Sequence, residues 1–184
     1  MVELYWSPNY NEIIRILKEN KSKVVVAGVR AFFYRGIPVF RFTKDLDIVC
    51  TLVIDELREK VTKQLRSLGY NVSWRVWGLT VEKDLDRIDI MIKPIIIDKE
   101  FYERCKVLNV DGEVFIPSIE DTIILKIIAS RKQDIKDVKM VLHILNREFE
   151  DRIDFAYLFK RAEQAGVKVK KKLMRYLRIA GFEI

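Results

Sequence analysis

The hydrophobic pattern of the chain changes at Pro117, and this change limits the folds that the sequence can adopt. Before Pro117, short β-branched runs such as "KVVVAG" (23–28) and "LDIVC" (46–50) alternate with amphipathic helical segments. After Pro117, only helical periodicity remains, and Ser118 has the position of an N-cap for the first of these helices. We therefore predict an α+β fold, with a small mixed sheet flanked by helices over residues 1–116 and a C-terminal helical bundle over residues 117–184.

Local signals place the elements of the first part. Ser7 and Pro8 are typical of a helix start, and residues 54–69 have helical spacing that ends at a glycine. The segments "NVSWRVW" (71–77) and "RIDIMI" (87–92) alternate like strands, with Gly78 expected in the turn region between them. The Asp-Gly pair in "NVDGEVFI" (109–116) predicts a hairpin.

The composition is that of a globular chain without a membrane segment. Of 184 residues, 49% are hydrophobic and 33% are charged, and no apolar run approaches the roughly 20 residues of a membrane span. The first residues do not have the pattern of a signal peptide. The two cysteines, Cys50 and Cys105, are far apart, so we expect reduced thiols in a cytoplasmic protein.

The positive charge is concentrated near the C-terminal end. Between Lys160 and Arg178 there are eight Lys or Arg and one Glu, whereas the rest of the chain has 34 − 8 = 26 basic and 27 − 1 = 26 acidic residues. On a helix, five of these basic side chains share one stripe: Lys168, Lys171, Lys172, Arg175 and Arg178. The packing stripe of the same helix is predicted to be Val169, Leu173, Tyr176 and Leu177. The stripe fits a nucleic-acid contact. A terminal helix solvated by lysines explains it equally well.

The tetrapeptide Lys-Asp-Leu-Asp occurs twice, at residues 44–47 and 83–86. In the first copy Asp45 and Asp47 share one face of a strand, where two carboxylates can hold a divalent cation. The second copy has the pattern of a charged hairpin connection, and the acid on the matching face of the next strand is Asp89. The alternative is that all three are solvated aspartates at strand ends.

These residues resemble the nucleotidyltransferase superfamily, which includes DNA polymerase β and the CCA-adding enzymes. The resemblance covers residues 24 to about 140 and rests on two blocks. The first block comprises Gly28-Val29-Arg30-Ala31, Gly36, the run from Arg41 to Ile48, and Asp89. The second is similar to small prokaryotic nucleotidyltransferases, including toxins of abortive-infection toxin–antitoxin systems, and comprises Glu120, Asp121, Lys126, Arg131, Asp134 and Asp137.

The resemblance implies a nucleotidyltransferase fold and a magnesium-dependent enzyme. Two Mg²⁺ ions bound by Asp45, Asp47 and Asp89 would support transfer of a nucleoside monophosphate from a nucleoside triphosphate, such as ATP, to an acceptor hydroxyl. The residues implied in nucleotide or phosphate binding are Gly28, Val29, Arg30, Thr43, Lys44 and Lys126. The basic stripe favours RNA, such as tRNA, as the acceptor, and the toxin-like block suggests an antitoxin protein as a partner.

Two positions leave alternatives open. The family usually has Gly or Ser where this chain has Val29, and a branched side chain there would crowd the triphosphate. The second hypothesis is therefore a catalytically silent protein of the same fold that binds nucleotide, RNA or a protein partner. Lys126 lies in an aliphatic helix and could instead extend its head to solvent. Arg131, Asp134 and Asp137 are expected to form a helix-junction network, with Asp134 as an N-cap.

Overall fold

The computed structural model describes residues 6–39, 45–94, 96–109 and 113–183, which form two compact units. The first unit comprises Met1–Ala27, Phe42–Pro94 and Lys106–Ile116. The second comprises Gly28–Arg41, Ile95–Cys105 and Pro117–Ile184. The sequence-based division at Pro117 coincides with one boundary between the units. Two earlier segments, 28–41 and 95–105, belong with the C-terminal helices.

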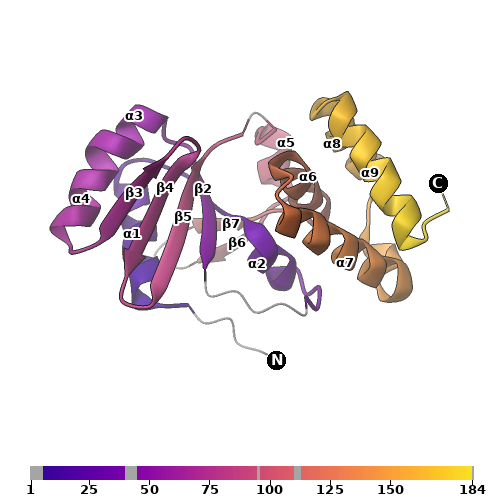
Figure 1. Ribbon diagram of the computed structural model, residues 1–184, viewed down its shortest axis with the longest axis horizontal. Helices are drawn as coiled ribbons and strands as arrows, with labels where there is room; N and C mark the ends of the chain where they lie inside the picture. Colours follow the sequence, from indigo (N-terminus) through magenta and orange to yellow (C-terminus); the bar gives the residue numbers. More distant parts are fainter. Residues whose placement is uncertain (1–5, 40–44, 95, 110–112, 184) are drawn as a thin grey trace. The chain divides into compact units, whose positions relative to one another are not determined.

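The first unit is built on a mixed seven-stranded sheet with the order β3-β4-β5-β2-β1-β7-β6 (Figure 1). The strands are β1 (Val24–Val26), β2 (Leu46–Cys50), β3 (Asn71–Arg75), β4 (Gly78–Lys83), β5 (Asp86–Ile92), β6 (Lys106–Asn109) and β7 (Glu113–Ile116). Two of the pairs, β2 with β5 and β1 with β7, are parallel, and the others are antiparallel. The predicted mixed sheet is therefore confirmed.

The prediction for Gly78 was wrong, because this residue begins a strand that the sequence analysis did not identify. β4 pairs with β3 and β5, and Gly78 lies opposite Arg75 and Met91. The turn before β4 is made by residues 76 and 77. The second Lys-Asp-Leu-Asp copy is a hairpin connection between β4 and β5, as predicted. The Asp-Gly pair at 111–112 lies outside the described residues, although its flanking strands β6 and β7 pair as a hairpin.

Helices cover one face of this sheet. They are α1 (Pro8–Glu19), capped by Ser7 as predicted, and a continuous helical segment made of α3 (Ile54–Glu56), the π-helical turn η1 (Leu57–Val61) and α4 (Thr62–Ser67). The Asn9 amide of α1 donates to Asp86 Oδ2 at 2.8 Å, on the face that Asp86 shares with Ile88. Trp74 Nε1 donates to Thr62 Oγ1 from the same face. Both helical segments therefore pack against the aliphatic side of the sheet.

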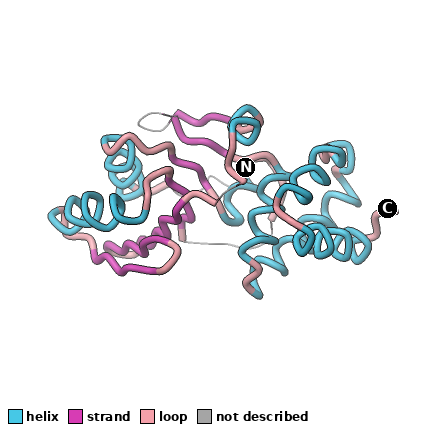
Figure 2. Tube along the Cα trace, turned by 90° about the horizontal axis from the view of Figure 1, so that it is seen from above, coloured by secondary structure: helices cyan, strands magenta, loops and turns pink. Residues whose placement is uncertain are grey.

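The regular elements among the described residues of the second unit are all helices, and Figure 2 draws helices in cyan. They are α2 (Gly28–Tyr34), α5 (Lys99–Glu103), α6 (Ile119–Ala129), α7 (Lys132–Glu148), the 3₁₀ turn η2 (Glu150–Arg152), α8 (Phe155–Gln164) and α9 (Val167–Ala180). Ser118 caps α6, as predicted. Among the described residues, none of the helices is both long enough and apolar enough to cross a membrane.

The core of the second unit combines residues from distant parts of the chain. Phe32, Ile37 and Ile96 are buried together with the inner faces of α6, α7, α8 and α9. A buried polar network adds to this packing. Arg161 of α8 is fully buried and donates to Asp121 Oδ1, Asp98 Oδ2 and the Ile96 carbonyl. Segment 95–105 is thus fastened to the C-terminal helices by both apolar and charged contacts.

Candidate active site

The parallel pairing of β2 and β5 places Asp47 directly beside Asp89. In-register residues on neighbouring strands lie about 4.8 Å apart and point to the same side. That side is opposite the aliphatic face covered by α1 and α4, because Ile48, Ile88 and Ile90 occupy the alternate positions. The structure therefore brings together two of the three predicted carboxylates on the face that these two helices leave uncovered.

Asp89 is held in place by side chains that the sequence analysis did not single out. Only 8% of Asp89 is exposed. Thr80 of β4 pairs with Asp89 and donates a hydrogen bond from Oγ1 to Asp89 Oδ1 at 2.9 Å, and Arg87 Nη2 lies 3.6 Å from the same oxygen. Thr80 could be found only by recognising β4 and its register, whereas Arg87 stands two residues before Asp89 on the same strand face. These contacts orient one carboxylate and partly balance its charge.

Asp45 immediately precedes β2 and is exposed. It is two residues before Asp47, which is half-buried. Carboxylate oxygens are hard donors that suit Mg²⁺, and two neighbouring carboxylates repel each other unless a cation lies between them. Among the described residues, no three His, Cys, Asp or Glu side chains are grouped as metal ligands. The Asp47–Asp89 pair fits a divalent cation in chemistry, and Asp45 is its nearest neighbour in sequence.

The segment predicted to bind phosphate begins the second unit. Gly28 has a left-handed backbone (φ +69°), which favours glycine at this turn from β1 into α2. Val29 is 2% exposed and Arg30 is 3% exposed. The branched side chain of Val29 is thus packed inside the protein rather than presented to solvent. Thr43 and Lys44 lie outside the described residues.

Lys126 lies in a buried charge network between α6 and α7, which corrects the alternative that its head reaches solvent. Its ammonium is 3.0 Å from Asp134 Oδ1 and 2.8 Å from Asp137 Oδ2. Arg131 Nε also donates to Asp134, at 2.7 Å. The helix-junction network is therefore confirmed and includes Lys126. A contact between Lys126 and a phosphate stays a prediction, since two carboxylates already balance this cation.

The prediction that Asp134 caps α7 was wrong. Arg131 occupies the N-cap position and makes no capping side-chain bond, whereas Asp134 lies within the first turn. The carboxyl of Asp134 is directed to Lys126 and Arg131 instead. Burial opposes the charged form, but the hydrogen bond from Arg131 and the nearby Lys126 hold the pKa of Asp134 below its ordinary value.

The basic residues of α9 do not form one uniform stripe. Lys168, Lys171, Arg175 and Arg178 are exposed, but Lys172 is half-buried and donates to Ser130 Oγ at 2.6 Å. The predicted packing stripe is confirmed, because Val169, Leu173, Tyr176 and Leu177 are all buried. Four of the five predicted cations therefore face solvent, and the fifth fastens α9 to the end of α6.

Three solved structures match most of the length of the chain. ANT(2'')-Ia in complex with adenylyl-2''-tobramycin is 16% identical, with a TM-score of 0.51 over 89% of this chain and 94% of that one. The solution structure of the same antibiotic-resistance factor has 15% identity and a TM-score of 0.49, over 86% and 96% of the two chains. An antigenic nucleotidyltransferase-like protein from Paracoccidioides brasiliensis has 16% identity and a TM-score of 0.49, over 91% and 89%. At this identity, the first of these similarities establishes the fold alone.

The sequence comparisons give the family. No curated protein sequence matches the chain. The profile of the family described as "Nucleotidyltransferase of unknown function (DUF6036)" matches residues 10–179, which is nearly the whole chain. This match agrees with the mixed sheet and with the family resemblance seen in the sequence. The chain therefore belongs to this family of the nucleotidyltransferase superfamily.

Proposed function

We propose that this protein transfers a nucleoside monophosphate from a nucleoside triphosphate to a hydroxyl group, with Mg²⁺ as cofactor. The observation that carries the proposal is the in-register pair of Asp47 and Asp89 on neighbouring parallel strands of a nucleotidyltransferase fold. Two carboxylates in this arrangement repel each other, and a divalent cation that carries a triphosphate would offset this repulsion.

Each residue has a distinct part in this proposal. Asp47 and Asp89 would hold Mg²⁺ from adjacent strands, with Asp45 as a third ligand and, by the resemblance, two ions in all. Bound Mg²⁺ would neutralise triphosphate charge and lower the pKa of the acceptor hydroxyl. Thr80 and Arg87 keep the Asp89 carboxylate oriented, and this orientation suits a ligand or a general base. Gly28, Val29 and Arg30 are assigned to the phosphates by the resemblance.

Calorimetry with non-hydrolysable nucleoside triphosphates tests this proposal. We expect binding in the presence of Mg²⁺, loss of binding with a chelator, and loss of binding in an Asp45→Asn, Asp47→Asn variant. Asp84→Asn is the control, because it replaces the aspartate of the second tetrapeptide copy that corresponds to Asp45, at the hairpin between β4 and β5. The Asp84 variant should bind like the wild type.

The opposite result would select the alternative function. If no triphosphate binds with Mg²⁺, or if the Asp45, Asp47 variant binds unchanged, the protein is a non-catalytic member of the family. Its partners would then be sought among RNA and proteins directly. If binding is seen, labelled triphosphate and candidate acceptors can be tested for transfer.

For the acceptor, RNA such as tRNA is the candidate that the charge of α9 favours. Four exposed cations on one helix suit an anionic partner, either RNA or an acidic protein surface, so the acceptor has to be tested directly. Incubation with radiolabelled triphosphates and total tRNA should label the RNA, and the labelling should disappear in the Asp45→Asn, Asp47→Asn variant. Labelling of protein or of a small hydroxyl compound, with none on RNA, would rule out this acceptor.

A toxin-like role, with an antitoxin as partner, follows from the resemblance of the second block. Induced expression in a bacterial host should then arrest growth, and the Asp45→Asn, Asp47→Asn variant at equal abundance should not. Equal growth with both proteins would argue against toxicity by nucleotidyl transfer. The cytoplasmic location proposed from the sequence fits two cysteines that form no disulfide, Cys50 and Cys105.

A further inference from the structure

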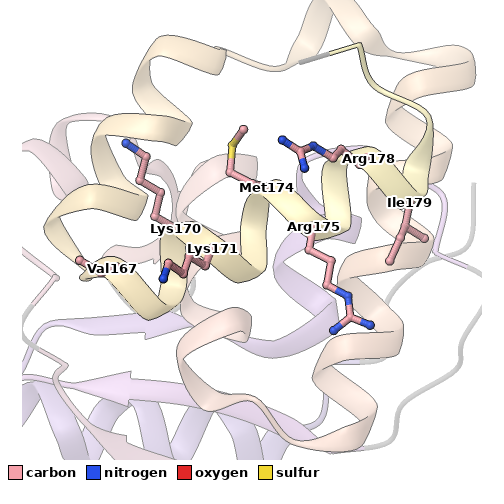
Figure 3. Close-up of a pocket in the computed structure, with 7 residues that line it drawn as sticks. All are labelled: Val167, Lys170, Lys171, Met174, Arg175, Arg178 and Ile179. Carbon is pink, nitrogen blue, oxygen red and sulfur yellow. The ribbon is translucent and has the colours of Figure 1, made fainter.

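The outward side of α9 carries a groove between two rows of side chains (Figure 3). One row is Lys170, Met174 and Arg178, and the other is Val167, Lys171, Arg175 and Ile179. Successive members of each row are four residues apart, so the rows are the i, i+4 ridges of a helix surface. Figure 3 shows Lys170, Met174 and Arg178 pointing to one side of the helix axis and Lys171, Arg175 and Ile179 to the other.

The groove combines apolar and cationic groups. Val167 is 70% exposed and Ile179 is 54% exposed, although both are aliphatic. Met174 lies between them along the helix and is half-buried. The other lining residues, Lys170, Lys171, Arg175 and Arg178, are all basic, and Lys170 pairs with Glu163 of α8. The surface therefore offers hydrocarbon and positive charge together, over about 18 Å of helix length from Val167 to Ile179.

This combination distinguishes between two kinds of anionic partner. Single-stranded nucleic acids bind by phosphate contacts and by stacking of bases on aromatic rings, and the lining residues include no aromatic side chain. Exposed valine, methionine and isoleucine give no advantage to a hydrated phosphate backbone. A second helix, in contrast, packs one ridge into the groove between two i, i+4 rows and buries such side chains.

We propose that this groove is a docking site for an acidic amphipathic helix of a partner protein. Aliphatic side chains of the partner would lie against Val167, Met174 and Ile179. Glu or Asp side chains on either side of that apolar row would meet Lys171, Arg175 and Arg178. The inference stands independently of nucleotidyl transfer, because it uses only the outward side of α9.

A designed peptide tests the proposal by fluorescence anisotropy with the full-length protein. The probe is a fluorescein-labelled 16-residue helix with leucines four residues apart on one ridge and glutamates beside them. A second peptide has the same composition with its leucines spread around the helix, and a 16-nucleotide single-stranded RNA is the third probe. The first peptide, called the ridge peptide, should bind about tenfold more tightly than the second, rearranged peptide. Only the ridge peptide can bury its leucines in the groove.

Variants of α9 separate the apolar from the charged contribution. The double variant Val167→Ser, Ile179→Ser should weaken binding of the ridge peptide by about fivefold or more. Because both side chains are exposed, this variant should keep the fold. Lys171→Glu should weaken binding of the ridge peptide by about tenfold. The matched control is Lys168→Glu, an equal charge change on the same helix outside the groove, which should stay within about twofold. Circular dichroism verifies the helical content of each variant.

Three results would overturn the docking site. The two peptides could bind equally, or the serine variant could bind the ridge peptide like the wild type. Either result would show that the apolar side chains of the groove do not contribute to binding. The RNA could bind more tightly than the ridge peptide, with Lys168→Glu as harmful as Lys171→Glu. That last pattern would identify α9 as a general polyanion surface instead.

Discussion

At the scale of single residues, Gly78 illustrates how closely two strands can constrain one position. Its φ of +150° is in the range that side chains rarely adopt, and a Cβ built there would lie 1.9 Å from the Ile90 carbonyl oxygen. Ile90 is adjacent to Asp89 on β5, so the close packing that Gly78 permits also helps to position the backbone of the strand that carries the candidate ligand. The absence of a side chain at this position is required by the backbone of the neighbouring strand.

We expect Gly78→Ala to lower the free energy of unfolding more than Gly69→Ala does. Gly69 also has a positive φ (+83°), but an added Cβ would meet nothing within 4 Å. The free energy of unfolding of the Gly69→Ala variant should therefore fall only by the cost of a left-handed backbone at alanine, about 1–2 kcal/mol. The Gly78 variant must in addition displace the Ile90 carbonyl or open the β4–β5 pairing. Urea unfolding of both variants measures the difference, and equal losses would contradict the predicted clash.

At the scale of helices, the junction of α6 and α7 depends on buried charges. Lys126 of α6 is held by Asp134 and Asp137 of α7, and all three side chains are at most 5% exposed. Removing one member of a buried ion network leaves an unbalanced charge, which typically costs about 3–5 kcal/mol. The network thus specifies how the two helices meet, even though a fully apolar contact could be equally stable.

The Asp134 carboxylate gives this junction a pH dependence. Its pKa in the folded protein lies below the ordinary value of 3.8, so in acid the unfolded chain binds the proton more readily. The stabilisation is therefore present above about pH 4 and is lost as the pH falls through the lower, folded value. Asp134→Asn should destabilise the protein at pH 7 by about 3 kcal/mol, at the lower end of the range for buried ion pairs because Asp137 still contacts Lys126, and the gap to the wild type should narrow below pH 4.

Urea unfolding at pH 7 and pH 3 checks this expectation for the junction. Asp84→Asn serves as the control, because Asp84 lies in an exposed hairpin turn with a left-handed backbone that asparagine tolerates. A gap between Asp134→Asn and the wild type that is the same at both pH values would mean that the Asp134 charge does not stabilise the fold.

At the scale of the whole molecule, the chain passes between its two units repeatedly. Segments 28–41 and 95–105 leave the first unit and contribute to the second. Phe32, Ile37 and Ile96 belong to the apolar core of the helical unit, and Asp98 accepts from the fully buried Arg161. The helical unit is therefore not encoded by the C-terminal residues alone.

We accordingly expect a fragment of residues 117–184 not to fold on its own. It lacks the two segments that close its core, so it would expose apolar surface and leave Arg161 without Asp98 and the Ile96 carbonyl. Circular dichroism during urea titration should show a broad, non-cooperative loss of helix, compared with a sharp transition for the full chain. A sharp transition in the fragment would show that residues 117–184 form a self-sufficient domain.

The sequence by itself determined much of the local structure and the family resemblance. Alternation with a period of two identified the strands at 46–50 and 87–92. Serine caps at Ser7 and Ser118 marked two helix starts. These features follow from interactions between residues a few positions apart, and such interactions can be predicted from the spacing of residues in the sequence.

Only the tertiary structure decided which distant residues meet. β4 was missed because it begins at Gly78, a residue type that is typical of turns, and the need for glycine there depends on the neighbouring strand β5. The pairing of Asp47 with Asp89, the hydrogen bond from Thr80, and the burial of Lys126 between two aspartates all depend on register and packing across many residues. The same holds for segments 28–41 and 95–105, which complete the helical core. The hydrophobic effect depends on which side chains are buried together in space, and the sequence separation between them does not enter.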